Sequence, residues 1–382
     1  MAFTYRKANE SDRDRYIDLA NMVFSMAHRP HDFKVLLPKV YGDDKQTAHM
    51  QYIALNAQDE LRALTAVMPG EMVVMGERLK TGYVGTVSSH PYARGEGHMK
   101  QLMQIALEDM RSGGTDISML GGQRQRYEYF GYTRGGASLT YRVTATNARH
   151  ALRDADVSGI EIRPISAEDG DAIAQAHALF LTKPVHGLRA VDAFHEIATS
   201  WTARLLGIHR HGEFIGYMII GWGNSASPIT EFMLTDMSLT GAVIKKHLQD
   251  TGVDHCEITC AAFNLPLRRA LARFAEDSTA GEAQQLCVFN FPKVVGAFFK
   301  LKASVSRLED GVRSFVIDGQ PLTVEVANGV PSVTADARPD AKHLTALDAQ
   351  FLFFGRDGEL FDEPLPMGWA PLPLYLDGAD CF

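Results

Sequence analysis

The sequence predicts an α/β (α+β) protein built from two similar mixed-sheet domains and a smaller third domain. Residues 83–87 are β-branched, aromatic or small, as in a strand, and a glycine turn then leads to apolar residues at helical spacing up to residue 110. The pattern of strand, acidic cap and helix at residues 3–24 returns at residues 160–180. These observations predict a strand–turn–helix unit inside a duplicated fold, although unrelated αβ domains can share the same rhythm.

With 382 residues the chain is too long for one ordinary hydrophobic core. We expect three domains, at residues 1–145, 146–288 and 289–382. The second copy lacks an arginine-glycine turn before its helix near residue 240, so we expect it to be degenerate. In the third domain, the pattern of residues 343–355 fits either a strand or a helix.

Composition and charge exclude several classes of protein. The chain is 46% hydrophobic and 22% charged, which is typical of a globular protein. No apolar run approaches the roughly 20 residues of a membrane helix, and the N-terminal residues are too polar for a signal peptide, so we expect a cytoplasmic protein without membrane contact. The net charge of −8 argues against general binding of nucleic acid.

The cysteines and histidines give little indication of a metal site. The cysteines lack paired C-x-x-C spacing, which predicts reduced and mostly buried thiols. His28, His31 and Asp32 have a spacing that a metal could use, but we expect surface residues or the rim of an acceptor pocket, and no metal. The four cysteines are Cys256, Cys260, Cys287 and Cys381.

The glycine turn within SSHPYARGEGHMKQLM, residues 88–103, is the strongest sign of chemistry. The first N–H groups of a helix lack intrahelical partners and favour an anion. Gly95 and Gly97 carry no Cβ, so a phosphate could approach the main chain, and Arg94 can grip it bidentately. The alternative is a tight strand-to-helix corner without a ligand. A dinucleotide fingerprint is absent, because no third glycine follows at the required offset.

The order of Pro91, Arg94, Gly95, Gly97 and Leu102 resembles the P-x-x-R-G-x-G-x-x-x-x-L signature of the GNAT acetyltransferases. In that family the R-x-x-G-x-G/A core holds the pyrophosphate of acetyl-CoA, so the resemblance implies acetyl-CoA as cosubstrate. Over the whole chain the architecture resembles the Eis-like branch, which acetylates lysines and aminoglycoside amines. That branch has an active GNAT domain, a degenerate GNAT domain and a C-terminal domain like a sterol carrier protein.

The resemblance also implies which residues contact the cosubstrate. The end of the fourth strand would meet the pantetheine arm through its main chain, the turn and helix start would hold the pyrophosphate, and the end of the fifth strand would add a second contact. His98 would act through its backbone N–H. These residues are Val87, Ser88, Ser89, Arg94, Gly95, Glu96, Gly97, His98, Met99, Lys100, Gly122 and Gln123.

Two catalytic groups are implied in the same way. The segment YEYFGY matches the family's Y-x-x-x-G-[FY], which puts the proton donor at Tyr127, and the α-carboxylate of Phe382 would be the proton acceptor. Alternatively, Tyr127 belongs only to an aromatic core and Phe382 is a frayed terminus. Asp377 and Asp380 would attract a cationic amine or be solvated turn residues.

The sequence therefore predicts an N-acetyltransferase that acts on a primary amine of a small molecule, a peptide or a lysine. Aminoglycosides are a further option, but Cys381 replaces an acidic residue of the relatives that accept them, and Met26 stands near the position of their pocket aspartate. The branch also implies a homo-oligomer, for example a hexamer. A different class remains open, a binding protein for an apolar ligand with a vestigial acetyltransferase site.

Overall fold

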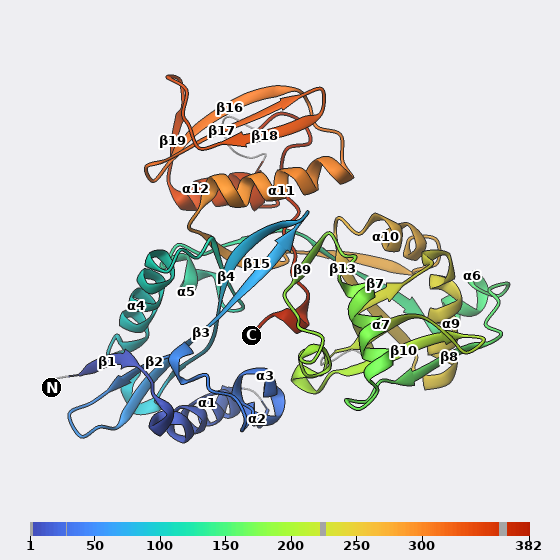
Figure 1. Cartoon of the computed structure of the whole chain (residues 1–382), viewed down its shortest axis with the longest axis horizontal. Coiled ribbons are helices and arrows are strands. Elements are labelled where there is room, and N and C mark those ends of the chain that lie inside the picture. Colours follow the sequence, from blue (N-terminus) through green and yellow to red (C-terminus); the bar gives the residue numbers. More distant parts are fainter. Residues whose placement is uncertain (1–2, 28, 222–226, 359–364) are drawn as a thin grey trace. The chain divides into compact units, whose positions relative to one another are not determined.

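The first 135 residues supply most of a mixed β-sheet in this computed structural model, which describes residues 3–27, 29–221, 227–358 and 365–382 (Figure 1). Its strands, in spatial order, are β1 (Thr4–Lys7), β2 (Gln51–Leu55), β3 (Leu61–Val74), β4 (Glu77–Ser89), β5 (Ile117–Leu120), β15 (Gln284–Val288) and β6 (Thr133–Gly135). Strands β4 and β5 run parallel, and the other neighbours in this order are antiparallel.

Helices cover this sheet where the sequence pattern predicts them. The apolar face of α4 is buried through Leu102, Met103 and Ala106, so the predicted helical spacing is confirmed. At the N-terminus, Asn9 and Asp12 form a capping box that starts the first helical turn. The helices are α1 (Arg13–Ala27), α2 (Phe33–Leu36), α3 (Pro38–Tyr41), α4 (His98–Ser112) and α5 (Arg124–Glu128), with 3-10 turns η1 (Glu10–Asp12), η2 (Ala48–Met50) and η3 (Pro91–Ala93).

A second mixed sheet has the same plan. In spatial order its strands are β14 (Asp277–Gly281), β7 (Ser138–Thr144), β13 (His255–Ala261), β12 (Pro228–Leu234), β11 (Glu213–Ile220), β10 (Arg204–Arg210) and β8 (Ile160–Pro164). Accompanying elements are α6 (Ala145–Ala151), α7 (Gly170–Phe180), β9 (Val185–Gly187), α8 (Phe194–Ala198), η4 (Ser200–Thr202), η5 (Met237–Leu239), α9 (Thr240–Thr251) and α10 (Leu265–Leu271). Strands β12 and β13 are parallel, as β4 and β5 are in the first sheet.

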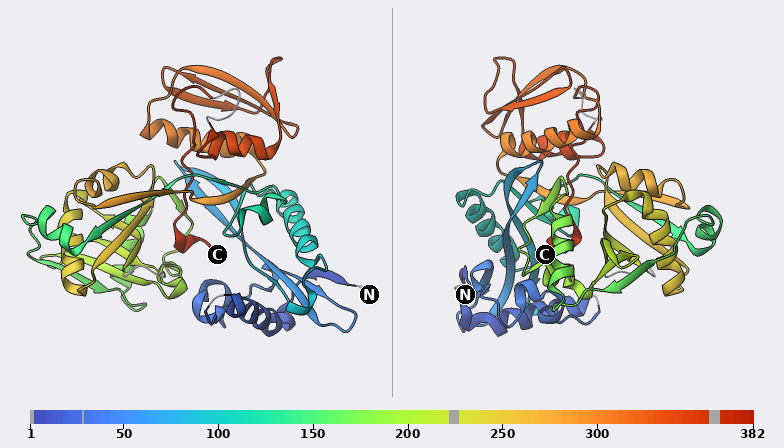
Figure 2. Two further views of the ribbon diagram at one scale, coloured as in Figure 1. Left: turned by 180° about the vertical axis from the view of Figure 1, so that it is seen from behind. Right: turned by 45° about the vertical axis from the view of Figure 1, so that its right-hand side comes forward.

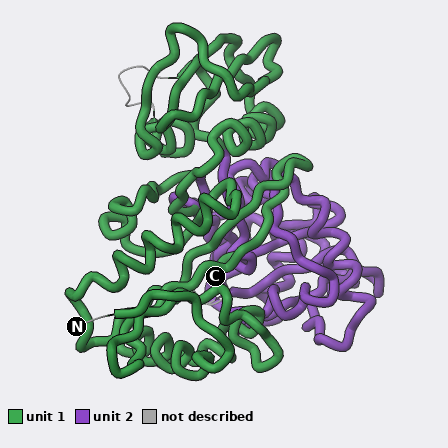
Figure 3. The backbone as a smooth tube through the Cα atoms, turned by 60° about the vertical axis from the view of Figure 1, so that its left-hand side comes forward, with its two compact units in different colours: residues 1–135, 284–372, 381–382 green, residues 136–283, 373–380 purple. Residues whose placement is uncertain are grey.

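The two sheets exchange one strand. Strand β7 follows β6 along the chain but pairs with β13 and β14, whereas β15 follows β14 but pairs with β5 and β6. The chain accordingly divides into a first unit, residues 1–135, 284–372 and 381–382, and a second unit, residues 136–283 and 373–380 (Figure 3). Each exchanged strand belongs to the unit whose sheet it pairs in, and the division into three domains at 145 and 288 stays a prediction.

A smaller α+β layer follows β15 within the first unit. Helices α11 (Phe291–Val305) and α12 (Ala346–Phe354) accompany a sheet of β18 (Val330–Thr334), β17 (Gln320–Ala327), β16 (Gly311–Ile317) and β19 (Lys342–Leu344) (Figure 2). The undecided segment contains both elements, since β19 ends at Leu344 and Thr345 caps α12. Edge-to-face contacts of Phe299 with Phe353 and Trp369 fill the core of this layer. Its likeness to sterol carrier proteins stays a prediction.

All four cysteines are buried and none of them forms a disulfide, as predicted. Within the described ranges, no helix combines the length and the apolar character that a bilayer crossing requires.

Candidate active site

A pocket opens where β4 and β5 separate. The two strands pair only as far as Val84 opposite Leu120. Just beyond, the register of β4 against β3 shifts, and Thr86 has a φ of 44°, in the left-handed region that β-branched residues rarely adopt. A hydrogen bond of 2.7 Å between the hydroxyls of Thr86 and Tyr41 holds this strained residue. The bulge therefore turns the end of β4 away from its neighbour and exposes main-chain groups to the pocket.

The pocket has a volume of about 1060 Å³ and is formed by α1, the end of β4, the glycine turn, the start of α4 and the end of β5. Residues that the sequence did not single out also line it, among them Phe24, Gly85 and Arg126. Most of the predicted site residues line it together: Val87, Ser89, Arg94, Gly95, Gly97, His98, Met99, Lys100, Gly122, Gln123 and Tyr127.

Two predicted contact residues use their side chains elsewhere. The buried hydroxyl of Ser88 donates to the carbonyl of Thr86 at 3.0 Å. The carboxylate of Glu96 lies 2.8 Å from Nε2 of His98. Neither side chain lines the pocket, because each is engaged in holding the local backbone.

The glycine turn fits a pyrophosphate group. Gly95 and Gly97 have φ values of 86° and 84°, and a Cβ at either position would have no atom within 4 Å. Gly97 precedes the first residue of α4, whose first N–H groups have no intrahelical acceptor. Arg94 is exposed beside the turn, and the Lys100 ammonium lies 4.7 Å from the centre of the Tyr129 ring. Open space, free donors and positive charge thus meet at one end of the pocket.

His98 has a side-chain role that the sequence did not reveal. Its ring is only 2% exposed and lies between the Tyr5 hydroxyl, 2.9 Å from Nδ1, and Glu96 at Nε2. These contacts tie the start of α4 to β1 and to the turn. No local pattern predicts this role, because Tyr5 is 93 residues away in the chain.

Tyr127 belongs both to the core and to the pocket. Its ring contacts the Tyr132 ring and packs so closely on Gly122 that a Cβ there would collide with it. Burial raises the pKa of Tyr127 above its ordinary value, and this effect outweighs the opposing one of the Arg126 guanidinium. The phenol therefore keeps its proton at neutral pH and can donate it.

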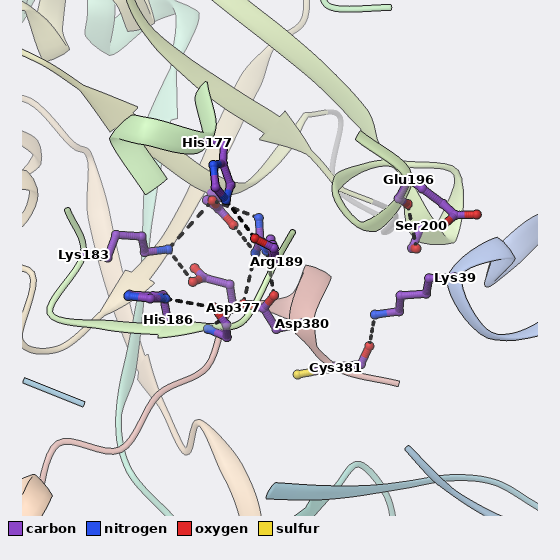
Figure 4. Close-up of polar contacts among 12 residues, drawn as sticks. Lys39, His177, Lys183, His186, Arg189, Glu196, Ser200, Asp377, Asp380 and Cys381 are labelled. Carbon is purple, nitrogen blue, oxygen red and sulfur yellow. Dashed lines mark hydrogen bonds and ion pairs between the residues drawn. The ribbon is translucent and has the colours of Figure 1, made fainter. Parts of the chain in front are cut away.

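Phe382 packs against a residue that lines the first-unit pocket. Its ring packs on Gly85, where a Cβ would collide with it, and lies 6.2 Å from the Tyr41 ring centre. The ammonium of Lys39 donates to the carbonyl of Cys381 (Figure 4). The last residue is thus packed against the protein and is not a frayed end.

Other candidate residues have different roles from those expected. Asp377 and Asp380 are neither solvated nor in this pocket, because both form buried ion pairs in the second unit. His31 is buried against Phe24 and Phe33, which corrects the expectation of a surface residue. Asp32 caps α2, and His28 lies outside the described residues. Met26 is exposed and does not line the pocket.

Residues 4–135 match the family model of the acetyltransferase (GNAT) domain. All residues that line the pocket fall within this range. Together with the pocket, the match defines the protein as an acyltransferase, and such an enzyme takes an acyl-CoA as its cosubstrate.

Solved structures with the same fold cover nearly the whole chain. A GCN5-related N-acetyltransferase from Anabaena variabilis is 14% identical with a TM-score of 0.69, and the match covers 100% of both chains. A probable N-acyltransferase from Enterococcus faecalis is 16% identical, with a TM-score of 0.68 over 92% of this chain and 90% of that chain. Eis1 from Mycobacterium abscessus is 15% identical, with a TM-score of 0.60 over 93% and 90%. These likenesses show a common fold, and no curated protein matches the sequence.

Proposed function

We propose that the protein transfers the acetyl group of acetyl-CoA to a primary amine of a small molecule, a peptide or a lysine. The observation that carries this proposal is the pocket between β4 and β5, which has the open glycine turn at one end and the Tyr127 ring on its wall. In this proposal the turn binds the pyrophosphate of acetyl-CoA, and the exposed end of β4 binds its pantetheine arm.

Each group has a defined task in the proposed reaction. Acetyl-CoA supplies a thioester, and the neutral amine forms a bond to its carbonyl carbon while the carbon–sulfur bond breaks. Main-chain N–H groups at residues 87–89 stabilise the charge that develops on the carbonyl oxygen. The Tyr127 hydroxyl donates its proton to the leaving thiolate, and the α-carboxylate of Phe382 receives the proton of the amine.

Thiol release from acetyl-CoA tests the proposal, with a panel of lysine peptides, small amines and aminoglycosides, and with water alone as the blank. We expect release that depends on an amine. Tyr127→Phe removes only a hydroxyl, so kcat should fall by about a hundredfold or more while the affinity for acetyl-CoA stays the same. Tyr129→Phe, on an exposed ring two residues away, is the matched control and should keep wild-type kcat.

The outcome also separates the two classes of function. Tight binding of acetyl-CoA without thiol release on any amine would contradict the acetyltransferase and favour a binding protein with a vestigial site. Equal kcat for wild type and Tyr127→Phe would remove the proton-donor role.

A further inference from the structure

The second sheet contains a cavity that the proposed reaction does not use. The parallel strands β12 and β13 pair at Pro228 and Ile229, and later residues of both strands line a cavity of about 330 Å³. In the first sheet, the corresponding place between the parallel strands β4 and β5 is the candidate active site. All residues that line the cavity belong to the second unit, so the cavity is a feature of that unit alone.

Most of the cavity wall is apolar and buried. Phe232 and Leu234 come from β12, Cys260 and Ala261 from β13 and Leu267 from α10, and each is at most 8% exposed. An apolar cavity of about 150 Å³ is large enough for benzene, so a cavity of roughly twice that volume has room for an aromatic ring with a short side chain. The wall therefore fits a small ligand with an apolar body.

One part of the wall carries buried charges. The carboxylates of Glu231 and Asp377 and the ammonium of Lys183 belong to residues that line the cavity. Their side chains are 2%, 8% and 15% exposed, so water screens their charges only weakly. Figure 4 shows Lys183 directed at Asp377. A ligand in the cavity would thus meet charged groups in a largely apolar surrounding.

The charges of this group do not cancel. The guanidinium of Arg189 lies 2.8 Å from a carboxylate oxygen of Glu231 and 2.6 Å from one of Asp380. The ammonium of Lys183 pairs with Asp377 and lies 3.9 Å from Glu231. Among the described residues, three buried carboxylates therefore face two cations. Because an uncompensated buried charge is costly, the group favours one further positive charge.

Asp377 is the carboxylate at which this further charge fits best. Glu231 already accepts two hydrogen bonds from Arg189 and one from the Tyr217 hydroxyl. Burial, Glu231 and Asp380 raise the pKa of Asp377 to about 6, although the neighbouring cations oppose the shift. A proton thus supplies the further charge in mildly acidic solution, and the ammonium of a ligand can supply it at neutral pH.

We propose that the cavity of the second unit binds a small amine with one positive charge, whose ammonium lies against Asp377 and whose apolar body fills the space between β12 and β13. A polyamine would bury its other charges among apolar side chains, and an anion would add to the excess of negative charge. The site is separate from the proposed acetyl transfer and does not depend on it.

Three probes of similar shape test the charge of the ligand: 2-phenylethylamine, the neutral 2-phenylethanol and the anionic phenylacetate. Calorimetric titration of the full-length protein at neutral pH, without acetyl-CoA, gives the affinity and the stoichiometry of each. We expect the amine to bind at least about tenfold more tightly than the alcohol, the order expected for one charged hydrogen bond, and phenylacetate to bind more weakly than both. Equal affinity for the amine and the alcohol, or tighter binding of phenylacetate, would overturn the proposal.

Variants of the second unit test where the amine binds. Asp377→Asn leaves two cations with two carboxylates, so it should fold and should lose the preference for the amine over the alcohol. Ala261→Leu places a larger side chain in the cavity wall and should abolish the binding of both probes there. Asp156→Asn, at an exposed ion pair with Arg210 in the same unit, is the matched control and should bind both probes as wild type does.

The proposed function allows the first-unit pocket to bind an amine as well, and the variants leave that pocket unchanged. The binding that Ala261→Leu removes is therefore the binding in the second-unit cavity. Wild-type stoichiometry and affinity in both Asp377→Asn and Ala261→Leu would overturn the proposal even if acetyl transfer is confirmed. Loss of amine binding in these variants of a protein that shows no amine-dependent thiol release would support the cavity and reject only the proposed function.

Discussion

Gly97 combines two features that restrict what can replace it. Its φ of 84° disfavours side chains other than that of asparagine or aspartate. A Cβ at this position would have no atom within 4 Å, because it would point into open space at the turn. A side chain there would project into the space proposed for the pyrophosphate.

We predict that Gly97→Asp lowers the affinity for acetyl-CoA at least about tenfold, because a negative charge would face the phosphates. The side chain of Gly97→Asn has the same shape as that of Gly97→Asp but no charge. The difference in acetyl-CoA affinity between the two variants therefore measures the electrostatic part of the loss. Calorimetric titration gives both affinities. Wild-type affinity in Gly97→Asp would remove the pyrophosphate assignment.

Among the described residues, the cations of Lys183 and Arg189 form a buried network with the three carboxylates of Glu231, Asp377 and Asp380. Asp377 is a carboxylate of this network whose charged form is disfavoured. Burial, Glu231 and Asp380 raise the pKa of Asp377 to about 6, although Lys183 and Arg189 oppose the shift. Glu231 has its pKa lowered to about 2: burial opposes the charge of this carboxylate, but Arg189 and Lys183 outweigh that effect. Asp377 therefore takes up a proton before Glu231 as the pH falls.

The raised pKa of Asp377 has a consequence for stability. Its contribution is fully present below the unfolded pKa of about 4 and is lost as the pH rises through about 6. We predict that wild type loses stability between about pH 4 and 6.5 relative to Asp377→Asn, which cannot ionise, and that the difference then stays constant at higher pH. Melting temperatures of both proteins across this range check the sign. Parallel curves would mean that Asp377 does not take up a proton there.

At the scale of elements, the tail from residue 373 combines two ion-paired aspartates with a packed terminal residue, Phe382. Adding a few residues after Phe382 leaves Asp377 and Asp380 in place but removes the α-carboxylate from the end of Phe382. We predict that kcat falls by about a hundredfold, the order expected for loss of a positioned base, while acetyl-CoA affinity and melting temperature stay close to wild type. If the extended protein turns over its best amine at the native rate, the Phe382 role is wrong.

Local elements could be predicted from the sequence because their causes are local. The glycine turn and the apolar face of α4 depend on residues close together in the chain. The strand exchange could not be predicted, because nothing in the residues of β7 and β15 indicates which strands they pair with. Asp380 gave no sign of burial for the same reason, because Arg189 is 191 residues away.

At the scale of the whole molecule, the resemblance to the Eis-like branch leads us to predict a homo-oligomer. Exposed apolar side chains such as Val330 and Met367, in the smaller α+β layer, are available for such contacts. Sedimentation velocity at micromolar concentration should show a species larger than 42.1 kDa. A single monomeric boundary would contradict this prediction.

The exchange of β7 and β15 also determines when this protein can begin to work. As the nascent chain leaves the ribosome, the sheet that carries the glycine turn has a vacant position between β5 and β6 until residues 284–288 emerge. Until then the edges of β5 and β6 are exposed to pairing with other chains. Premature termination within the second unit would therefore yield an aggregation-prone fragment and not a small active acetyltransferase, even though residues 4–135 carry every group that lines the pocket.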